Sequence, residues 1–178
     1  GGDVAGVVTA LGPGVTDVAV GARVLIDPNV DYGDGRRGAL GYPLQGGLCE
    51  YVAVPAANLL PLPPTVSFEQ AAALPIAYGT AHRMLFTRGQ VRAGETVVVL
   101  GASGGVGVAC VQLAVLAGAT VIAVASAPWK LERLRALGAA HTVLARGGEY
   151  GAEVWRLTER RGADVIVDYS GRVTWPTS

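Results

Sequence analysis

The chain has 178 residues, of which 51% are apolar, enough to bury one sizeable core or one core and part of another. Lysine plus arginine and aspartate plus glutamate number 14 each, with no block of like charge, so the composition excludes a surface built for nucleic acid or for an anionic membrane. Two cysteines, Cys49 and Cys110, are too few for a disulfide framework or a four-cysteine zinc site, and a reducing cytoplasm is the expected compartment.

The first part of the chain, residues 1–58, predicts β structure. Alternating or apolar runs occupy 4–11, 23–26 and 50–54, and the stretches GPG and YGDGRRGALGYPLQGG break them. The sequence starts inside a strand pattern, with no initiator methionine and no secretory leader. We therefore expect a fragment of a longer protein.

Helical signals follow a proline-rich connector, PLPPTVS. Ser67, with Gln70 three residues later, predicts a capping box and a helix over 67–74. A second helical stretch is expected near 78–88.

Residues 97–126 contain no charged side chain, which raises the question of a membrane span. The stretch changes its period, however, as a single helix would not. A β-branched block at 96–100 predicts a buried strand, and four glycines then fall within 101–107. A helical apolar face follows, Gly118 predicts its end, and 120–124 predicts a second strand. The pattern therefore favours a βαβ unit over a membrane helix.

The glycines of this unit are spaced Gly101-x-x-Gly104-x-x-Gly107. After a parallel strand, the first glycine allows a tight turn, the second lets the backbone approach a diphosphate, and the third lets the helix pack closely. The amides that begin the helix then face the anion. The pattern predicts a dinucleotide site, with cofactor-binding candidates at Gly101, Ser103, Gly104, Gly105, Val106 and Gly107.

The residues after the second strand bear on which nicotinamide cofactor binds. A carboxylate there would hold a ribose 2′-hydroxyl, but the sequence is Ala-Ser-Ala over 125–127. Ser126 and Lys130 are candidates for binding a 2′-phosphate, and Arg146, after the next strand signal, is a third. We therefore expect NADPH in preference to NADH. The alternative is that Lys130 only solvates the exposed face of a helix over 130–137.

Further strand and helix signals extend the predicted parallel sheet. HTVLA (141–145) predicts a third strand, 149–161 a helix that stops at Gly162, and ADVIVDYSG (163–171) a fourth strand. Ser170, at the carboxyl end of this strand, is expected to face the same crevice as the glycine turn.

Four segments in this order resemble the medium-chain dehydrogenase/reductase superfamily: GGDVAGVVTALGPGVTDVAVGARVL, GGLCEYVAVPAANLLPLPPTVSFEQAAALPIAYGTAHRML, VRAGETVVVLGASGGVGVACVQLA and ADVIVDYSG. The resemblance covers nearly the whole chain. It implies an α/β protein with a partial GroES-like β-barrel domain (1–62), connecting helices (63–90) and a partial Rossmann domain (91–178). The Rossmann domain is a doubly wound parallel sheet, truncated at its C-terminus.

The resemblance also bears on metal binding. Zinc-dependent members have Gly-His-Glu where this chain has Gly1, Gly2 and Asp3, so Gly2 replaces a metal-binding histidine. Counted back from Thr80, the position of a later cysteine ligand is Ile76, and a shortened loop replaces the four-cysteine structural lobe. Because a catalytic zinc needs three protein ligands, we expect no zinc. The chain most resembles the zinc-independent quinone reductase and enoyl reductase branch.

That branch implies hydride transfer from NADPH to a small quinone or α,β-unsaturated carbonyl compound, polarised by hydrogen-bond donors. Thr80 matches the superfamily's threonine beside the nicotinamide, and Tyr78 is the second catalytic candidate. Tyr78 and the neighbouring donor His82 are equally consistent with ordinary packed or surface side chains. Asp3 is expected to satisfy backbone groups, and both cysteines to be small core residues.

Two other classes of function stay open. One is a nucleotide-binding module without turnover, because no acid–base pair is visible; the other is an alcohol dehydrogenase-like member of the superfamily. We expect neither a nucleic-acid nor a membrane partner. We expect a homodimer in the full-length parent and no activity in the 178-residue chain alone, because part of the substrate pocket would lie outside it.

Overall fold

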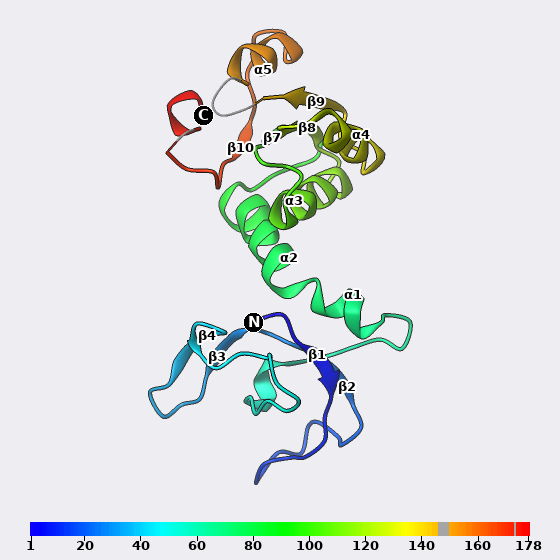
Figure 1. Ribbon diagram of the computed structural model, residues 1–178, viewed down its shortest axis with the longest axis vertical. Helices are drawn as coiled ribbons and strands as arrows, with labels where there is room; N and C mark the ends of the chain where they lie inside the picture. Colours follow the sequence, from blue (N-terminus) through cyan, green and yellow to red (C-terminus); the bar gives the residue numbers. More distant parts are fainter. Residues whose placement is uncertain (146–149, 173) are drawn as a thin grey trace. The chain divides into compact units, whose positions relative to one another are not determined.

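The computed structural model describes residues 1–145, 150–172 and 174–178. The chain divides into two compact units, Gly1–Ile76 and Ala77–Ser178, each with its own sheets and core (Figure 1). No helix within the described ranges is both long enough and apolar enough to cross a membrane.

The first unit contains two three-stranded sheets. Strands β1 (Ala5–Val7), β2 (Arg23–Ile26) and β6 (Leu59–Pro61) pair antiparallel in the order β1-β2-β6. Strands β3 (Asn29–Asp31), β4 (Arg37–Leu40) and β5 (Pro43–Leu44) form the second sheet, and a 3-10 turn, η1 (Ala56–Asn58), precedes β6. Ile26, Val30 and Leu40 are the buried centre of the unit.

The strands of this unit differ from the sequence-based boundaries. Strand β2 has the predicted ends, whereas the run 4–11 pairs only over Ala5–Val7. The run 50–54 is not a strand: Val52 and Val54 pack on the core, but no strand in the described part of the chain pairs with this backbone. The expected break at 32–47 contains β4 and β5. Gly38 makes room for them, since a Cβ there would lie 2.7 Å from Cδ of Pro43.

Two helices follow the sheets of the first unit. Helix α1 (Phe68–Ala72) has the predicted capping box, in which the Gln70 amide donates to Ser67 Oγ (3.2 Å) and the Ser67 amide to Gln70 Oε1 (3.0 Å). Helix α2 (Pro75–His82) continues into a π-helical turn, η2 (Arg83–Arg88), so the helix predicted near 78–88 is confirmed with an earlier start. Asp3 Oδ1 accepts a hydrogen bond from the Ile76 amide (2.9 Å) and thus satisfies backbone, as expected.

The second unit is a four-stranded parallel sheet. Strands β7 (Thr96–Val99), β8 (Thr120–Ala125), β9 (His141–Leu144) and β10 (Val165–Val167) run in the order β10-β7-β8-β9. Helices α3 (Gly105–Leu116), α4 (Pro128–Ala136) and α5 (Gly151–Leu157) alternate with them along the chain, and a 3-10 turn, η3 (Trp175–Thr177), follows β10. The βαβ unit predicted over residues 97–126 is therefore confirmed.

Alternate residues of the sheet face two separate cores. Val97 and Val99 of β7 pack with residues of α3 and α4, including Leu134. Val98, on the opposite face, packs with Val154 of α5. Because α3 and α4 cover one face and α5 the other (Figure 1), the sheet is doubly wound, and the predicted α/β class is confirmed.

Some helix and strand ends in this unit differ from the prediction. Helix α4 begins at Pro128 rather than residue 130, because proline is favoured in the first turn of a helix. Helix α5 ends at Leu157, since Glu159 and Arg160 have φ values of 53° and 66°, in the left-handed region. The fourth strand is confirmed over three residues only, Val165–Val167.

Candidate functional site

The strand order of the second unit reverses at β7, which has β8 on one side and β10 on the other. In open parallel sheets, ligands bind outside the carboxyl ends of the strands at such a switch point. The segments that leave this edge are the glycine turn after β7, Ser126 after β8 and residues 168–171 after β10. The Ala102 amide donates to the Val124 carbonyl (3.0 Å), which holds the turn beside the end of β8.

The surroundings of each glycine of the turn differ, and they show what a side chain at that position would meet. Gly101 has a φ of +60°, and its carbonyl accepts a hydrogen bond from the Gly104 amide (3.0 Å). A Cβ on Gly104 would meet nothing nearer than the Gly101 carbonyl at 3.5 Å, so this glycine faces open space. A Cβ on Gly107 would lie 2.5 Å from the Gly101 oxygen and 2.7 Å from the Ala102 carbonyl carbon, so only glycine lets α3 pack this closely. Gly101 and Gly107 thus have the conformational roles predicted for the first and third positions.

The N-terminus of α3 is not capped by a side chain. Its N-cap is Gly104, and the first-turn amides belong to Gly105, Val106 and Gly107, which have no acceptor four residues earlier within the helix. Ser103, half-buried, precedes them in the turn. The arrangement presents several N–H groups and the positive end of the helix dipole, which is the geometry that binds phosphate. The residues present therefore fit the diphosphate of a dinucleotide.

The residues from the end of β8 into α4, 125–131, contain one cation, Lys130, and no carboxylate. Ser126 is exposed, and Ala127, the N-cap of α4, supplies no side-chain cap. Lys130 lies in the first turn of α4, half-buried, with its Nζ 5.6 Å from the centroid of the Trp129 ring. The first turn of α4 has no acidic residue. Ser126 and Lys130 are thus on adjoining elements at the predicted edge, while Arg146 falls outside the described residues.

The segment after β10 is organised around a carboxylate. Asp168 Oδ1 accepts hydrogen bonds from the amides of Ser170 (2.9 Å) and Gly171 (3.2 Å), and its carboxylate also accepts from the hydroxyls of Thr174 and Ser178. Partial burial raises the pKa of Asp168, but these hydrogen bonds outweigh it and hold the pKa below its ordinary value.

Residues 169 and 170 contact the glycine turn from the side of β10. Ser170 Oγ lies 3.7 Å from the position that a Cβ on Gly101 would occupy. The Tyr169 hydroxyl donates to the Gly101 carbonyl (2.8 Å). The structure therefore brings Ser170 to the turn, as predicted, and adds Tyr169, which sequence reasoning missed because nothing in the local pattern links residues 68 positions apart.

The two catalytic candidates lie on α2. Thr80 is exposed, one helical turn beyond Ala77, whose Cβ lies 4.0 Å from where a Cβ on Gly105 would be. The Tyr78 hydroxyl donates to Oε1 of Gln112 on α3 and packs beside the core. The ring of His82 is edge-on to Phe86 at 5.0 Å between centroids. Thr80 is thus available to a ligand, whereas Tyr78 already has a hydrogen-bond partner.

The positions of the superfamily's zinc ligands come together in the first unit but offer no ligand atoms. A Cβ on Gly2 would lie 3.1 Å from Cδ1 of Ile76 and 2.9 Å from the Leu40 carbonyl oxygen. Glycine has no side chain to donate and isoleucine only an alkyl group, while Asp3 already accepts the Ile76 amide. These residues do not fit a catalytic zinc. In the described ranges, no three His, Cys, Asp or Glu side chains cluster as metal ligands.

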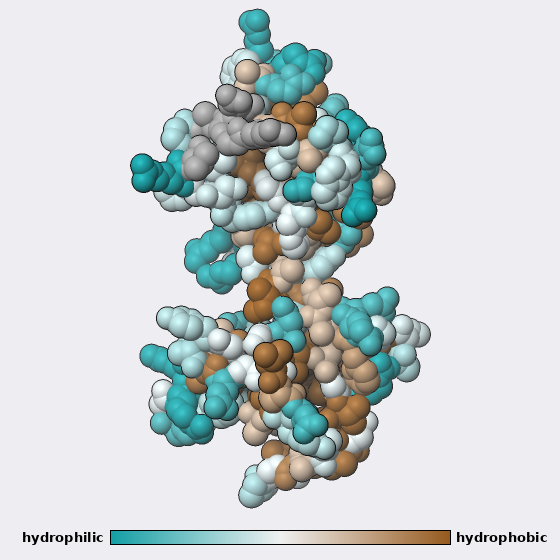
Figure 2. All heavy atoms as spheres, viewed as in Figure 1, coloured by the Kyte–Doolittle hydropathy of each residue, from teal (hydrophilic) through white to brown (hydrophobic). Residues whose placement is uncertain are grey.

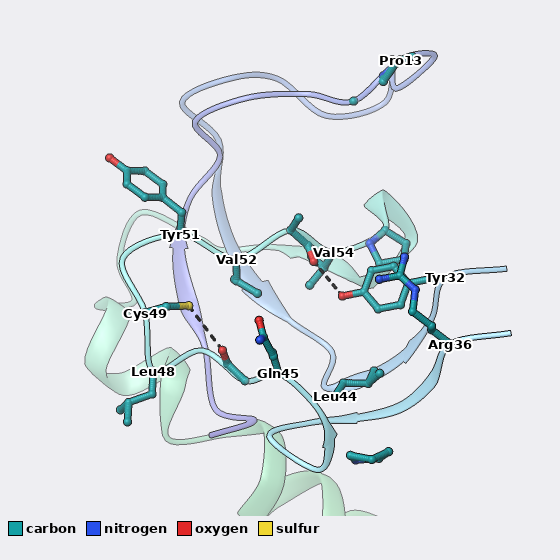
Figure 3. Close-up of a pocket in the computed structure, with 15 residues that line it drawn as sticks. Pro13, Tyr32, Arg36, Leu44, Gln45, Leu48, Cys49, Tyr51, Val52 and Val54 are labelled. Atoms are coloured by element: carbon teal, nitrogen blue, oxygen red, sulfur yellow. Dashed lines mark hydrogen bonds between the residues drawn. The ribbon is translucent and has the colours of Figure 1, made fainter. Parts of the chain in front are cut away.

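A wide hollow of about 1320 Å³ lies in the first unit (Figure 3). Tyr32, Leu44, Val52 and Val54 line it together with backbone, and the Tyr32 hydroxyl donates to the Ala53 carbonyl (2.9 Å). Cys49 also lines it and is exposed, so the prediction that Cys49 is a core residue in a strand is wrong. Cys110 is buried in α3 as predicted, and this burial raises the pKa of its thiol to about 11.

Two family models match the chain. The one described as "Alcohol dehydrogenase GroES-like domain" matches residues 1–64, and the one described as "Zinc-binding dehydrogenase" matches residues 105–178. Together they cover both units, in the order that the sequence predicts.

Individual dehydrogenases and reductases are also similar to this chain over nearly its whole length. A solved structure of an NAD-dependent alcohol dehydrogenase is 43% identical, with a TM-score of 0.89, over 96% of this chain and 53% of the other. The quinone oxidoreductase of Pseudomonas syringae pv. Tomato DC3000 is 36% identical, with a TM-score of 0.83, over 98% of this chain and 49% of the other. Crotonyl-CoA reductase of Streptomyces collinus is 30% identical over the whole chain, which spans 47% of that protein. Some other curated relatives are much longer synthases, of which the chain spans 7%.

Proposed function

The chain belongs to the medium-chain dehydrogenase/reductase superfamily, and we propose that the protein transfers a hydride from NADPH to a quinone or α,β-unsaturated carbonyl compound without a catalytic zinc ion. The glycine turn at the switch point of the parallel sheet carries this proposal, because it presents the uncapped amides of α3 where the superfamily binds its cofactor. The bound nicotinamide supplies the hydride; this chain binds the cofactor and orients it.

The proposed cofactor contacts divide by the part of the dinucleotide. The turn and first helical turn, Gly101 to Gly107, hold the diphosphate through backbone N–H groups. Ser126 and Lys130 hold the 2′-phosphate, with Arg146 as a further candidate, and Ser170 borders the crevice beside the turn. The absence of a carboxylate at 125–127 supports NADPH, since nothing there would repel the additional phosphate.

The proposal of zinc-independent chemistry rests on Gly2 and Ile76, which stand side by side where zinc-dependent members have ligands. Without a metal, hydrogen-bond donors polarise the substrate carbonyl. We propose Thr80 as the residue that positions the nicotinamide and its substrate, because its side chain is exposed one helical turn beyond Ala77, which contacts the start of α3 at Gly105. The hydroxyl of Tyr78 is engaged by Gln112, so its role is to hold α2 against α3 unless that hydrogen bond opens.

A second candidate is an NAD-dependent alcohol dehydrogenase activity. Its support is the NAD-dependent alcohol dehydrogenase structure at 43% identity. The two candidates differ in both cofactor and substrate. They can therefore be separated by measuring both nucleotide binding and turnover.

The first experiment titrates the protein with NADPH and NADH in parallel, followed by nucleotide fluorescence. We expect tighter binding of NADPH, and we expect Lys130→Ala to reduce the preference by about tenfold, since one charge-assisted contact to phosphate contributes about 1.5 kcal/mol. Arg135→Ala is the matched control, because Arg135 is an exposed cation on the same helix and removes the same charge. An unchanged NADPH preference in Lys130→Ala would remove Lys130 from the proposed site.

A second measurement needs no mutation. Lys130 is the only lysine in the 178 residues, so reductive ¹³C-methylation labels one side-chain amine besides the N-terminus. Its NMR signal should shift with NADPH and much less with NADH. Turnover is then compared, in a chain extended at both ends, between NADPH with a quinone or enone and NAD⁺ with an alcohol. Alcohol oxidation with NAD⁺ alone would support the second candidate, and binding without turnover in the extended chain would support a module that only binds nucleotide.

A further inference from the structure

We infer that Tyr169 is a positioning residue that fixes the glycine turn in the conformation that receives the cofactor diphosphate. The inference rests on the proposed function, because it assigns a role in that same site. Tyr169 is the second residue after β10, on the opposite side of the switch point from β8. It thus joins the two strand ends between which the crevice opens.

The hydrogen bond of Tyr169 is made to the residue that sets the turn. Its hydroxyl donates to the carbonyl of Gly101 (2.8 Å), which also accepts the Gly104 amide (3.0 Å). Holding this carbonyl fixes the peptide plane after Gly101, where the chain has its left-handed φ of +60°. The next peptide groups, from Ala102 to Gly104, join this one to the N-terminal amides of α3.

The ring of Tyr169 occupies the space that two glycines leave. A Cβ on Gly101 would lie 3.4 Å from the Tyr169 hydroxyl oxygen and 3.5 Å from Cε2 of the ring. A Cβ on Gly107 would collide with the same hydroxyl oxygen. One side chain therefore packs against the first and third glycines of the motif while the second, Gly104, stays open.

The hydroxyl stays a neutral donor over the physiological range. Burial, and after it the neighbouring Cys110 thiol, raises the pKa of Tyr169 to about 12. The contact to a carbonyl needs the proton on the hydroxyl, which this pKa retains.

A glycine-rich turn needs such a support. Glycine has the largest conformational freedom of any residue, and the turn and first helical turn contain Gly101, Gly104, Gly105 and Gly107. If the turn samples other conformations, ligand binding must first order it, which weakens the affinity without removing a ligand contact. Because the diphosphate is common to NADPH and NADH, loss of the support should weaken both equally.

The test is Tyr169→Phe in the whole chain, which keeps the ring and removes the hydrogen bond. We expect the Kd of NADPH and of NADH each to rise about three- to tenfold, with their ratio and the melting temperature nearly unchanged. Tyr32→Phe is the matched control: it likewise removes a hydroxyl that donates to a backbone carbonyl, that of Ala53 (2.9 Å) in the first unit, and should leave both Kd values unchanged.

The other outcomes are distinct. A lower melting temperature with unchanged Kd values would make Tyr169 a stability residue only and overturn the inference. A change confined to NADPH would place its effect at the 2′-phosphate and overturn it as well. If the unsubstituted protein binds neither nucleotide, the proposed function fails first, and the inference fails with it.

Discussion

The two units bury their apolar side chains to different extents. In the second unit, Val97, Val98 and Val99 of β7 are each 0% exposed, because helices close both faces of the sheet. In the first unit, Tyr42 and Leu48 are 85% and 97% exposed, and hydrophobic side chains reach its visible surface (Figure 2). Since free energy of unfolding is concentrated where apolar burial is densest, we expect the second unit to be the more stable platform, as a preorganised cofactor site requires.

The tryptophans allow this comparison to be measured unit by unit. Trp129, Trp155 and Trp175 are the only three in the chain, and all belong to the second unit. Tryptophan fluorescence in urea therefore follows unfolding of the second unit. Hydrogen exchange read by mass spectrometry follows the backbone of the first unit.

The largest effect is expected for truncation of a buried leucine in the second unit. Leu100 is 1% exposed between β7 and the glycine turn, so Leu100→Ala should lower the free energy of unfolding by about 2–5 kcal/mol, from lost burial and the cavity left behind. Leu60 in β6 is 49% exposed, and Leu60→Ala should cost about 0.5 kcal/mol or less. Urea unfolding measures the first, and exchange of the β2–β6 amides measures the second. Equal costs would contradict the difference in burial between the units.

An intermediate effect is expected when a methyl group is added to a glycine of each unit. Gly107→Ala places a Cβ against the Gly101 oxygen and the Ala102 backbone, so it should destabilise the second unit by about 1–3 kcal/mol and weaken cofactor binding. Tyr169→Phe should not rescue it, because the backbone collisions remain. Gly6 in β1 has open space around its Cβ position, and Gly6→Ala should be neutral or stabilise by up to about 1 kcal/mol. A loss of stability for Gly107→Ala in urea unfolding, together with no loss for Gly6→Ala in hydrogen exchange, would support the comparison between the units. An unchanged stability for Gly107→Ala would show that the turn can move to accept the methyl group.

The same difference between the units explains how much could be predicted from the sequence. The second unit was predictable because buried parallel strands are continuous apolar runs, helices have a 3.6-residue period, and glycines mark the turns between them. In the first unit, β3, β4 and β5 are two to four residues long and include Gly38 and Pro43, so no periodic signal exists to find. Their pairing depends on backbone hydrogen bonds rather than on a side-chain pattern.

The site shows the same division between local and distant information. The turn, the uncapped start of α3 and the position of Ser170 follow from patterns a few residues long. The contact of Tyr169 with Gly101 joins residues 68 positions apart, and Tyr78 meets Gln112 across 34 positions. These residues come together only when the sheet has formed, so the residue types in the sequence could not predict either contact.

The smallest effect is expected for a carboxylate in each unit. Asp168 accepts hydrogen bonds from two nearby amides and from the hydroxyls of Thr174 and Ser178, which only the folded chain brings to it, so Asp168→Asn should cost about 1–2 kcal/mol at pH 7. Asp34 bonds to Arg36, two residues away and exposed like it, a contact that the unfolded chain can also make. Asp34→Asn should therefore leave the urea midpoint unchanged.

The pH dependence separates these two carboxylates further. Because the pKa of Asp168 is lower in the folded chain, its contribution is fully present above the unfolded value near 3.8 and is lost as the pH falls toward the folded value. The difference in unfolding free energy between the unsubstituted protein and Asp168→Asn should therefore be constant from pH 7 to about pH 5 and shrink below about pH 4. Tryptophan fluorescence in urea at each pH measures it. A difference that persists unchanged at pH 3 would mean that the amides and hydroxyls around residue 168 stabilise a neutral side chain equally well, and that the charge contributes nothing to the order of this segment.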